Sequence, residues 1–209
     1  MPKLKAIVTS GPTIERIDPV RYISNDSSGK QGHAIAKALH QLGVEVTLIS
    51  GKVNIPTPKG VPIINVESAE DMLKAVESSL PADIFVGVAA VCDWKPEMNH
   101  LQKLKKNTSE DFLDIRFRKT PDILKIISNH ELRPNVVVGF AAETENLIEN
   151  AKNKLATKGC DYIIANDVSK AVFGSNTNKI SLISQSNVEH WDEMSKDEVA
   201  DRLLKMLIV

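Results

Sequence analysis

Continuous apolar runs alternate with amphipathic helical segments along most of the 209 residues. A run such as DIFVGVAAV at 83–91 predicts a strand buried on both faces, because a strand with one exposed face would alternate polar and apolar residues. The segments between such runs repeat their apolar residues with helical spacing. This alternation predicts an α/β fold, namely a doubly wound, mostly parallel, Rossmann-like sheet with helices on both faces.

The expected elements can be assigned from these patterns. Strands are expected at residues 4–8, 44–50, 61–66, 83–91, 112–118, 135–143 and 161–167. Helices are expected at residues 33–43, 68–80, 121–128, 146–158 and 195–207. Ser68 and Pro121 mark helix starts, and Gly43 and Gly159 mark helix ends. Two short runs at 179–184 and 188–193 predict a C-terminal β-hairpin.

Length and composition limit the classes of protein that fit. The length predicts a single domain over 1–209, whose least structured part is the polar segment 93–111. A net charge of −1 argues against a general nucleic-acid binder. No apolar run approaches the ~20 residues of a membrane span, and the start lacks a signal-peptide pattern, so a cytoplasmic location is expected. Two cysteines fit a reducing compartment.

A long polar loop separates the first expected strand from the first expected helix. It covers residues 9–32, TSGPTIERIDPVRYISNDSSGKQG. Because the loop ends at a helix N-terminus, it offers free backbone N–H groups and the positive end of a helix dipole to an anion. The loop therefore predicts a phosphate or nucleotide site. An ordinary helix start capped by Ser27 or Ser28 also fits the pattern.

Two common phosphate motifs are absent from this loop. Gly29-Lys30 is followed by Gln31 instead of the hydroxyl residue of a P-loop, and the loop lacks GxGxxG. In open α/β sheets, ligands bind outside the carboxyl ends of the strands. Small and polar residues lie at or just beyond the carboxyl ends of the expected strands, at 10–12, 50–51, 89–93, 140–143 and 165–167. They predict a ligand site along that edge.

The loop resembles the opening of phosphopantothenoylcysteine synthetase, the ligase of coenzyme A biosynthesis that joins phosphopantothenate to cysteine. The resemblance rests on GPT, DPVRYISN and SSGK with a following glycine, and it continues through AAV-x-D, K-x-K-K and ANDV over nearly the whole chain. The form is similar to the bacterial enzymes, which implies CTP as the nucleotide, with Mg²⁺ arriving on the triphosphate. It also implies a homodimer, with Arg16, Asp18 and Arg21 as interface candidates.

The resemblance implies a reaction in two halves and a role for particular residues. Phosphopantothenate and CTP give phosphopantothenoyl-cytidylate and pyrophosphate, and L-cysteine then displaces CMP. Asn25, in the YISN motif, acts on the intermediate, and Lys103 is the catalytic lysine of a flexible lid at about 94–109. The other nucleotide contacts implied are Ala89, Ala90, Asp93, Lys105, Lys106, Pro121, Asp122, Ile123, Leu124, Phe140, Lys154, Lys158 and Asn166.

Each of these residues also has a structural explanation. Asn25 fits a turn, Phe140 fits a core position, and KLKK at 103–106 fits a solvated basic loop. Cys92 is expected to be a buried, inert thiol, since no histidine partner is evident. The five histidines lack ligand-like spacing, so no structural zinc is expected.

Two other functions fit the same fold class. One is a Rossmann-type nucleotide-dependent oxidoreductase, and the other is a non-catalytic nucleotide-binding module. The missing GxGxxG and the lysine cluster disfavour the oxidoreductase. Many synthetases of the resembling family are fused behind a flavin-dependent decarboxylase. The chain is therefore expected to be either a stand-alone synthetase or one half of such a fusion, with neither nucleic acid nor a membrane as a partner.

Overall fold

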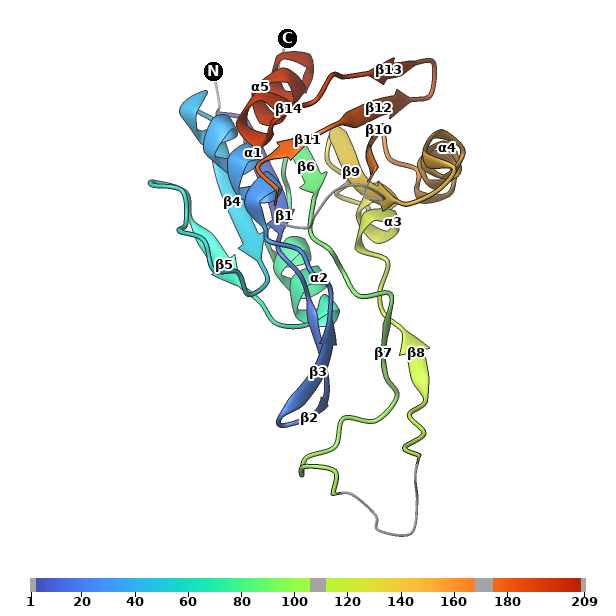
Figure 1. Cartoon of the computed structure of the whole chain (residues 1–209). Coiled ribbons are helices and arrows are strands. Elements are labelled where there is room, and N and C mark those ends of the chain that lie inside the picture. The colour runs from blue at the N-terminus through green and yellow to red at the C-terminus, as the bar shows by residue number, and fades with distance from the viewer. Residues whose placement is uncertain (1–2, 106–111, 168–174, 208–209) are drawn as a thin grey trace.

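A mostly parallel sheet forms the centre of the computed structural model, which describes residues 3–105, 112–167 and 175–207 (Figure 1). Its strand order within the described residues is β13-β12-β10-β9-β6-β1-β4-β5. The strands are Lys5–Ser10 (β1), Glu45–Ser50 (β4), Ile63–Asn65 (β5), Ile84–Gly87 (β6), Val136–Glu143 (β9), Tyr162–Asp167 (β10), Ile180–Ser184 (β12) and Val188–His190 (β13). The pairs from β5 to β10 are parallel, and β12 and β13 are antiparallel. The predicted fold class and C-terminal hairpin are confirmed.

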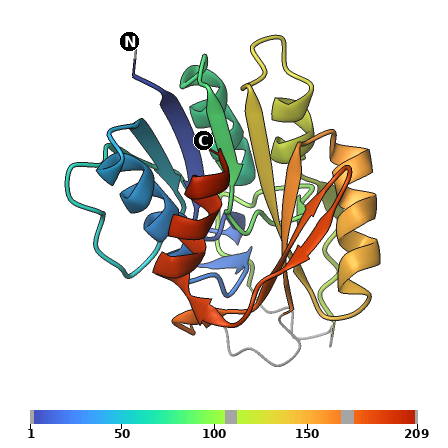
Figure 2. The same cartoon turned by 90° about the horizontal axis from the view of Figure 1, so that it is seen from above.

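Helices cover both faces of this sheet (Figure 2). They are Lys30–Gln41 (α1), Ala69–Ser78 (α2), Ile123–Ser128 (α3), Leu147–Lys158 (α4) and Lys196–Leu207 (α5). The neighbours Phe85 and Val86 on β6 explain why its sequence is apolar throughout. Val86 packs in a core cluster with α1 and α5, whereas Phe85 packs in a second cluster with α2, α3 and α4. None of the described helices is long and apolar enough to cross a membrane.

The predicted helix boundaries have clear local causes. Ser68 and Asp71 form a capping box at the start of α2, each side chain accepting from the other residue's backbone N–H. Gly159 ends α4 in the left-handed conformation with φ 76°. The third helix begins slightly later than expected from Pro121, because the Asp122 side chain accepts from Lys125 N–H and acts as its N-cap.

Short strands form in segments where the sequence predicts no strand, and one expected strand is shorter than predicted. Ile14–Asp18 (β2) and Arg21–Ser24 (β3) form a hairpin inside the polar loop. Trp94–Pro96 (β7) pairs with Phe117–Lys119 (β8). The strand expected at 112–118 begins only at Phe117 and is much shorter than predicted. Thr177–Asn178 (β11) pairs with Met194–Ser195 (β14). These pairings depend on partners that local patterns do not identify.

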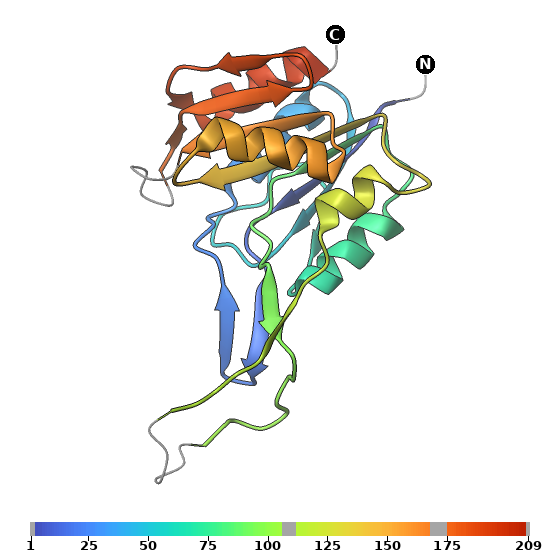
Figure 3. The same cartoon turned by 90° about the vertical axis from the view of Figure 1, so that its right-hand side faces the viewer.

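The β2–β3 hairpin and the chain around β7 and β8 project from the carboxyl edge of the sheet (Figure 3). We call the described residues 94–105 and 112–119 the arm. Its Leu104 is bound at the turn of the hairpin, where the Leu104 N–H donates to Asp18 (3.1 Å) and the Leu104 carbonyl accepts from Arg21 (2.8 Å). Burial opposes ionisation of Asp18, but Arg21 and the N–H groups of Val20 and Leu104 outweigh it and hold its pKa well below its usual range.

A close approach between α1 and β1 generates a first prediction. A Cβ added at Gly32 would lie 2.6 Å from Ser10 Cβ and 3.0 Å from the Thr9 carbonyl oxygen. We expect Gly32→Ala to lower the free energy of unfolding by about 1–3 kcal/mol, because the helix must move away from the strand. Urea unfolding measures this change. Gln41→Ala at the exposed end of the same helix is the control and should stay within about 0.5 kcal/mol of wild type.

Candidate active site

A cleft of about 760 Å³ opens at the carboxyl edge of the sheet. This volume is typical of sites that bind nucleotides and similar ligands. Most of the site residues expected from the sequence line it, although they come from six separate segments. They are Asn25, Ala89, Ala90, Asp93, Pro121, Asp122, Ile123, Leu124, Phe140, Lys154, Lys158 and Asn166.

The segments that follow β1 and β6 form the floor of the cleft. Beyond the sheet, the two segments stay paired, since Ala90 N–H donates to Gly11 (2.9 Å) and Thr13 N–H donates to Ala90 (3.2 Å). The Thr9 hydroxyl accepts from Ala89 N–H at 3.3 Å. Asn25 Nδ2 donates to the Ala90 carbonyl at 3.0 Å. The Asn25 amide is therefore fixed at the point where the two segments separate.

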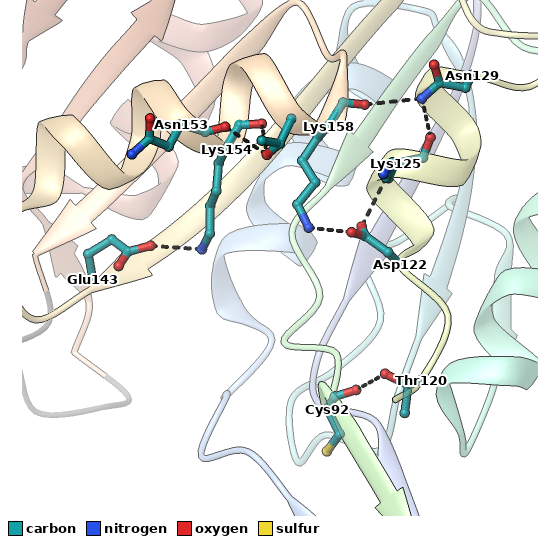
Figure 4. A network of polar contacts seen from close by, with 10 residues as sticks. Cys92, Thr120, Asp122, Lys125, Asn129, Glu143, Asn153, Lys154 and Lys158 are labelled. Atoms are coloured by element: carbon teal, nitrogen blue, oxygen red, sulfur yellow. Dashed lines mark hydrogen bonds and ion pairs between the residues drawn. The ribbon is translucent and has the colours of Figure 1, made fainter. Parts of the chain in front are cut away.

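Cys92 lies behind this floor and is buried, as expected for an inert thiol. Its N–H donates to the Thr13 hydroxyl (2.9 Å), and its thiol donates to the Thr13 carbonyl (3.5 Å). Its carbonyl accepts from the Thr120 hydroxyl (Figure 4). Burial raises the pKa of the Cys92 thiol, which makes the nucleophilic thiolate less accessible.

Two lysines of α4 reach the cleft with carboxylate partners (Figure 4). Lys154 pairs with Glu143, with an Nζ–Oε1 distance of 2.8 Å. Lys158 pairs with Asp122, the same residue that caps α3. Because both lysines are partly buried and paired, their positive charge on this side of the cleft is largely compensated.

The start of α1 forms the opposite side of the cleft. Its N-cap is Gly29, with φ 73° and no side-chain cap, so the alternative that Ser27 or Ser28 caps the helix is wrong. Both serines line the cleft instead. Behind the cap, the Ser10 hydroxyl donates to the Gly29 carbonyl at 2.9 Å. No side-chain cap covers the N-terminus of α1, which lies at the cleft and suits an anion.

A chain of side-chain amides crosses the cleft and was missed by sequence reasoning. Asn166 Nδ2 donates to Asn178 (3.3 Å), and Asn178 Nδ2 donates to Gln31 (2.9 Å). Gln31 Nε2 donates in turn to the Lys196 carbonyl (3.1 Å). These contacts join the C-terminal segment to the start of α1 across more than a hundred residues, and a local motif gives no signal for them.

The lysines of the predicted lid that the structure describes do not line the cleft. Lys103 and Lys105 lie on the arm, on either side of the tethered Leu104, and neither lines the cleft. Lys106 lies outside the described residues. The catalytic role of Lys103 therefore stays a prediction. Of the interface candidates, Arg16 pairs with Glu67 at 2.6 Å within the chain.

The chain belongs to a family defined by the C-terminal domain of the DNA/pantothenate metabolism flavoproteins, whose model matches residues 1–209. It is 42% identical over 205 residues to the coenzyme A biosynthesis bifunctional protein CoaBC of Borreliella burgdorferi, covering 97% of this chain and 52% of that protein. The chain thus spans about half the length of the curated relatives it matches.

Solved structures agree with this assignment. The crystal structure of the C-terminal domain of a CoaBC protein superposes with a TM-score of 0.82 at 36% identity, covering 98% of this chain and 93% of that one. A Cab2 variant in complex with phosphopantothenate-cysteine has the same fold, with a TM-score of 0.78 at 15% identity over 98% of this chain and 85% of that one. The family resemblance indicated by the sequence motifs is confirmed.

The histidine behind the α1 cap generates a pH prediction. His33 is buried, with Nδ1 3.0 Å from the Ser10 hydroxyl, and burial lowers its pKa. The unfolded chain therefore binds a proton more readily, and stability should fall as the pH drops below ~6.5 towards the lowered pKa. Urea unfolding between about pH 7.5 and pH 5 measures this loss. His33→Phe should show a weaker dependence on pH, and an unchanged dependence would contradict the assignment.

Proposed function

We propose that residues 1–209 act as one phosphopantothenoylcysteine synthetase domain. In the proposed reaction, the carboxylate of phosphopantothenate attacks the α-phosphorus of CTP, forming phosphopantothenoyl-cytidylate and releasing pyrophosphate. The amino group of L-cysteine then attacks the activated carbonyl carbon and releases CMP. This reaction needs no protein nucleophile, which is consistent with the burial of Cys92. Two anions must instead be held against each other while charge develops.

The observation that carries this proposal is the convergence of separate motifs on one cleft. The YISN, AAV-x-D and ANDV motifs contribute Asn25, Asp93 and Asn166 to the same cavity, although they are far apart in the sequence. The family membership and the similarity to CoaBC proteins support the same function. The Cab2 complex adds that a protein of this fold binds phosphopantothenate-cysteine.

The described residues suggest a division of roles within the cleft. The start of α1 would receive phosphates, and Phe140 would pack against the base. Asn25, fixed by its hydrogen bond to Ala90, would orient the acyl group of the intermediate. Lys154 and Lys158 would exchange their carboxylate partners for contacts with the nucleotide.

The proposal includes Mg²⁺, and the residues present fit an ion that stays on the triphosphate. The described residues contain no cluster of three or more His, Cys, Asp or Glu side chains suited to hold a metal. Asp93 lines the cleft and has no ion pair in the described part of the chain, so it is the carboxylate available to the ion. Mg²⁺ commonly binds through phosphates, water and one or two carboxylates, and it supplies charge neutralisation.

We further propose that the protein acts as a homodimer and that Lys103 serves the cleft of the partner. The arm projects beyond the carboxyl edge of the sheet, with Trp94 and Lys119 of its base lining the cleft. It exposes Trp94, Met98, Leu101, Phe112, Leu113 and Phe117. The neighbouring hairpin exposes Val20 and Tyr22. A cluster of exposed apolar side chains of this size is typical of an interaction surface. A cytoplasmic location and cooperation with a flavin-dependent decarboxylase, fused or separate, complete the proposal.

A substrate-omission assay tests the reaction directly. CTP, phosphopantothenate and L-cysteine are supplied together and then omitted one at a time, and pyrophosphate and CMP are measured. We expect pyrophosphate to depend on phosphopantothenate and CMP to depend additionally on cysteine, with ATP a poorer donor. Pyrophosphate release without phosphopantothenate would contradict the ligase. Absence of any release, together with binding of a nicotinamide cofactor, would favour the oxidoreductase.

The Asn25→Asp variant tests the second half-reaction. The new carboxylate would face the Ala90 carbonyl without a donor, so the acyl group loses its oriented amide. We expect phosphopantothenoyl-cytidylate to accumulate and CMP release to fall by about 10²–10³-fold, the usual effect of losing one oriented donor. Rapid-quench chromatography detects the intermediate. Asn54→Asp, an identical change in an exposed loop, is the control, and normal turnover in Asn25→Asp would exclude this role.

A mixing experiment tests whether Lys103 acts across the dimer. Lys103→Gln alone should slow pyrophosphate release by about 10²-fold, because a charge that stabilises the leaving group is lost. If chains carrying Lys103→Gln are mixed with chains carrying Asn25→Asp, each mixed dimer contains one complete cleft when Lys103 acts on the partner. We then expect about a quarter of the wild-type rate per chain, since half of the dimers are mixed. No recovery despite subunit exchange would assign Lys103 to its own cleft.

A further inference from the structure

Lys196 is a cleft residue that none of the sequence motifs contains. It lies at the first position of α5 and lines the cleft on the same side as the start of α1. Its backbone is held on both sides, since its N–H donates to the Asn176 carbonyl (3.0 Å) and its carbonyl accepts from Gln31 (3.1 Å). These contacts fix where the side chain enters the cleft.

A second lysine stands close to it. Lys30, in the first turn of α1, also lines the cleft and donates to the Asn176 side chain at 2.8 Å. Burial lowers the pKa of Lys196, and the positive charge of Lys30 lowers it further. Two ammonium groups are thus held near each other on a partly buried wall, an arrangement that favours the approach of an anion.

The acidic residues near Lys196 are engaged elsewhere. Asp197 pairs with Lys37, at 3.3 Å. Glu198 accepts from the N–H and hydroxyl of Ser195, and Glu193 accepts from the Thr177 hydroxyl. Within the described residues, no carboxylate forms an ion pair with Lys196. This distinguishes Lys196 from Lys154 and Lys158, whose charges already have partners.

We infer that Lys196 binds the phosphates of the nucleotide that lie farthest from its sugar, together with Lys30 and the N-terminal turn of α1. This inference rests on the proposed function and extends it to the C-terminal helix. The cleft wall provides two ammonium groups from α1 and α5 beside the uncapped N-terminus headed by Gly29. Only a group with several negative charges matches that set of donors.

The same geometry has consequences for the reaction. The phosphates farthest from the sugar leave as pyrophosphate, so a cation that contacts them stabilises charge on the leaving group. Since the Lys196 carbonyl accepts a hydrogen bond from Gln31, the C-terminal helix is linked directly to the start of α1. The nucleotide would consequently be oriented with its phosphates towards α1 and α5 and its base towards Phe140.

Binding of inorganic tripolyphosphate, a probe without base, sugar or ligase chemistry, tests the inference. We compare the wild type with Lys196→Met, Lys196→Arg and Lys205→Met by calorimetry, and we check folding by circular dichroism and thermal unfolding. Lys196→Met should weaken binding by about tenfold or more, whereas Lys196→Arg, which keeps the charge, should remain within about threefold of wild type. Lys205→Met, on the same helix outside the cleft lining, should bind as the wild type does.

Equal affinities of the wild type and Lys196→Met for tripolyphosphate would overturn the inference. So would equal losses in Lys196→Arg and Lys196→Met, because the residue would then act through its shape or through proton transfer. Lys196→Gln replaces the methionine variant if that variant does not fold. The two proposals can fail separately. If the wild type fails the substrate-omission assay but Lys196→Met still loses tripolyphosphate binding, the phosphate site is supported and only the ligase activity is contradicted.

Discussion

The pairing of two chain segments beyond the end of the sheet positions the cleft and both projections. β1 and β6 lie side by side, and Pro12 and Ala90 continue their parallel pairing after both strands have ended. The hydrogen bonds at Gly11 and Thr13 keep the segments together until one enters the hairpin and the other enters the arm. The cleft floor, the position of Asn25 and the direction of both projections follow from this short extension.

The sheet and its helices could be predicted from the sequence because their signals are local. The apolar run of β6 and the capping residues Ser68 and Gly159 each specify an element without reference to distant residues. The polar loop was harder, because IERID does not alternate apolar and polar residues and lies between Pro12 and Pro19. Asp18 closes the turn between its two strands by accepting from the N–H groups of Val20 and Arg21, both at 2.9 Å.

Some residues of the site could also be predicted from the sequence, and others could not. Residues that follow strand ends, such as Ala90 and Phe140, can be located once the sheet is parallel, because all its carboxyl ends meet at one edge. Lys196 could not, since its place in the cleft depends on contacts with Gln31 and Asn176. The arm lysines illustrate the converse: their motif is evident in the sequence, but their position depends on a tether at Asp18.

The contact of Leu104 with Asp18 and Arg21 places different functional residues at the two ends of the hairpin. Its base ends just before Asn25, whose amide faces the cleft of its own chain, and its turn holds Leu104 between Lys103 and Lys105. In the proposed dimer, the hairpin would therefore connect Asn25 of one cleft with the Lys103 that serves the other. In that dimer, a change in the twist of the hairpin would displace both ends, and it would couple acyl transfer in one subunit to pyrophosphate departure in the other.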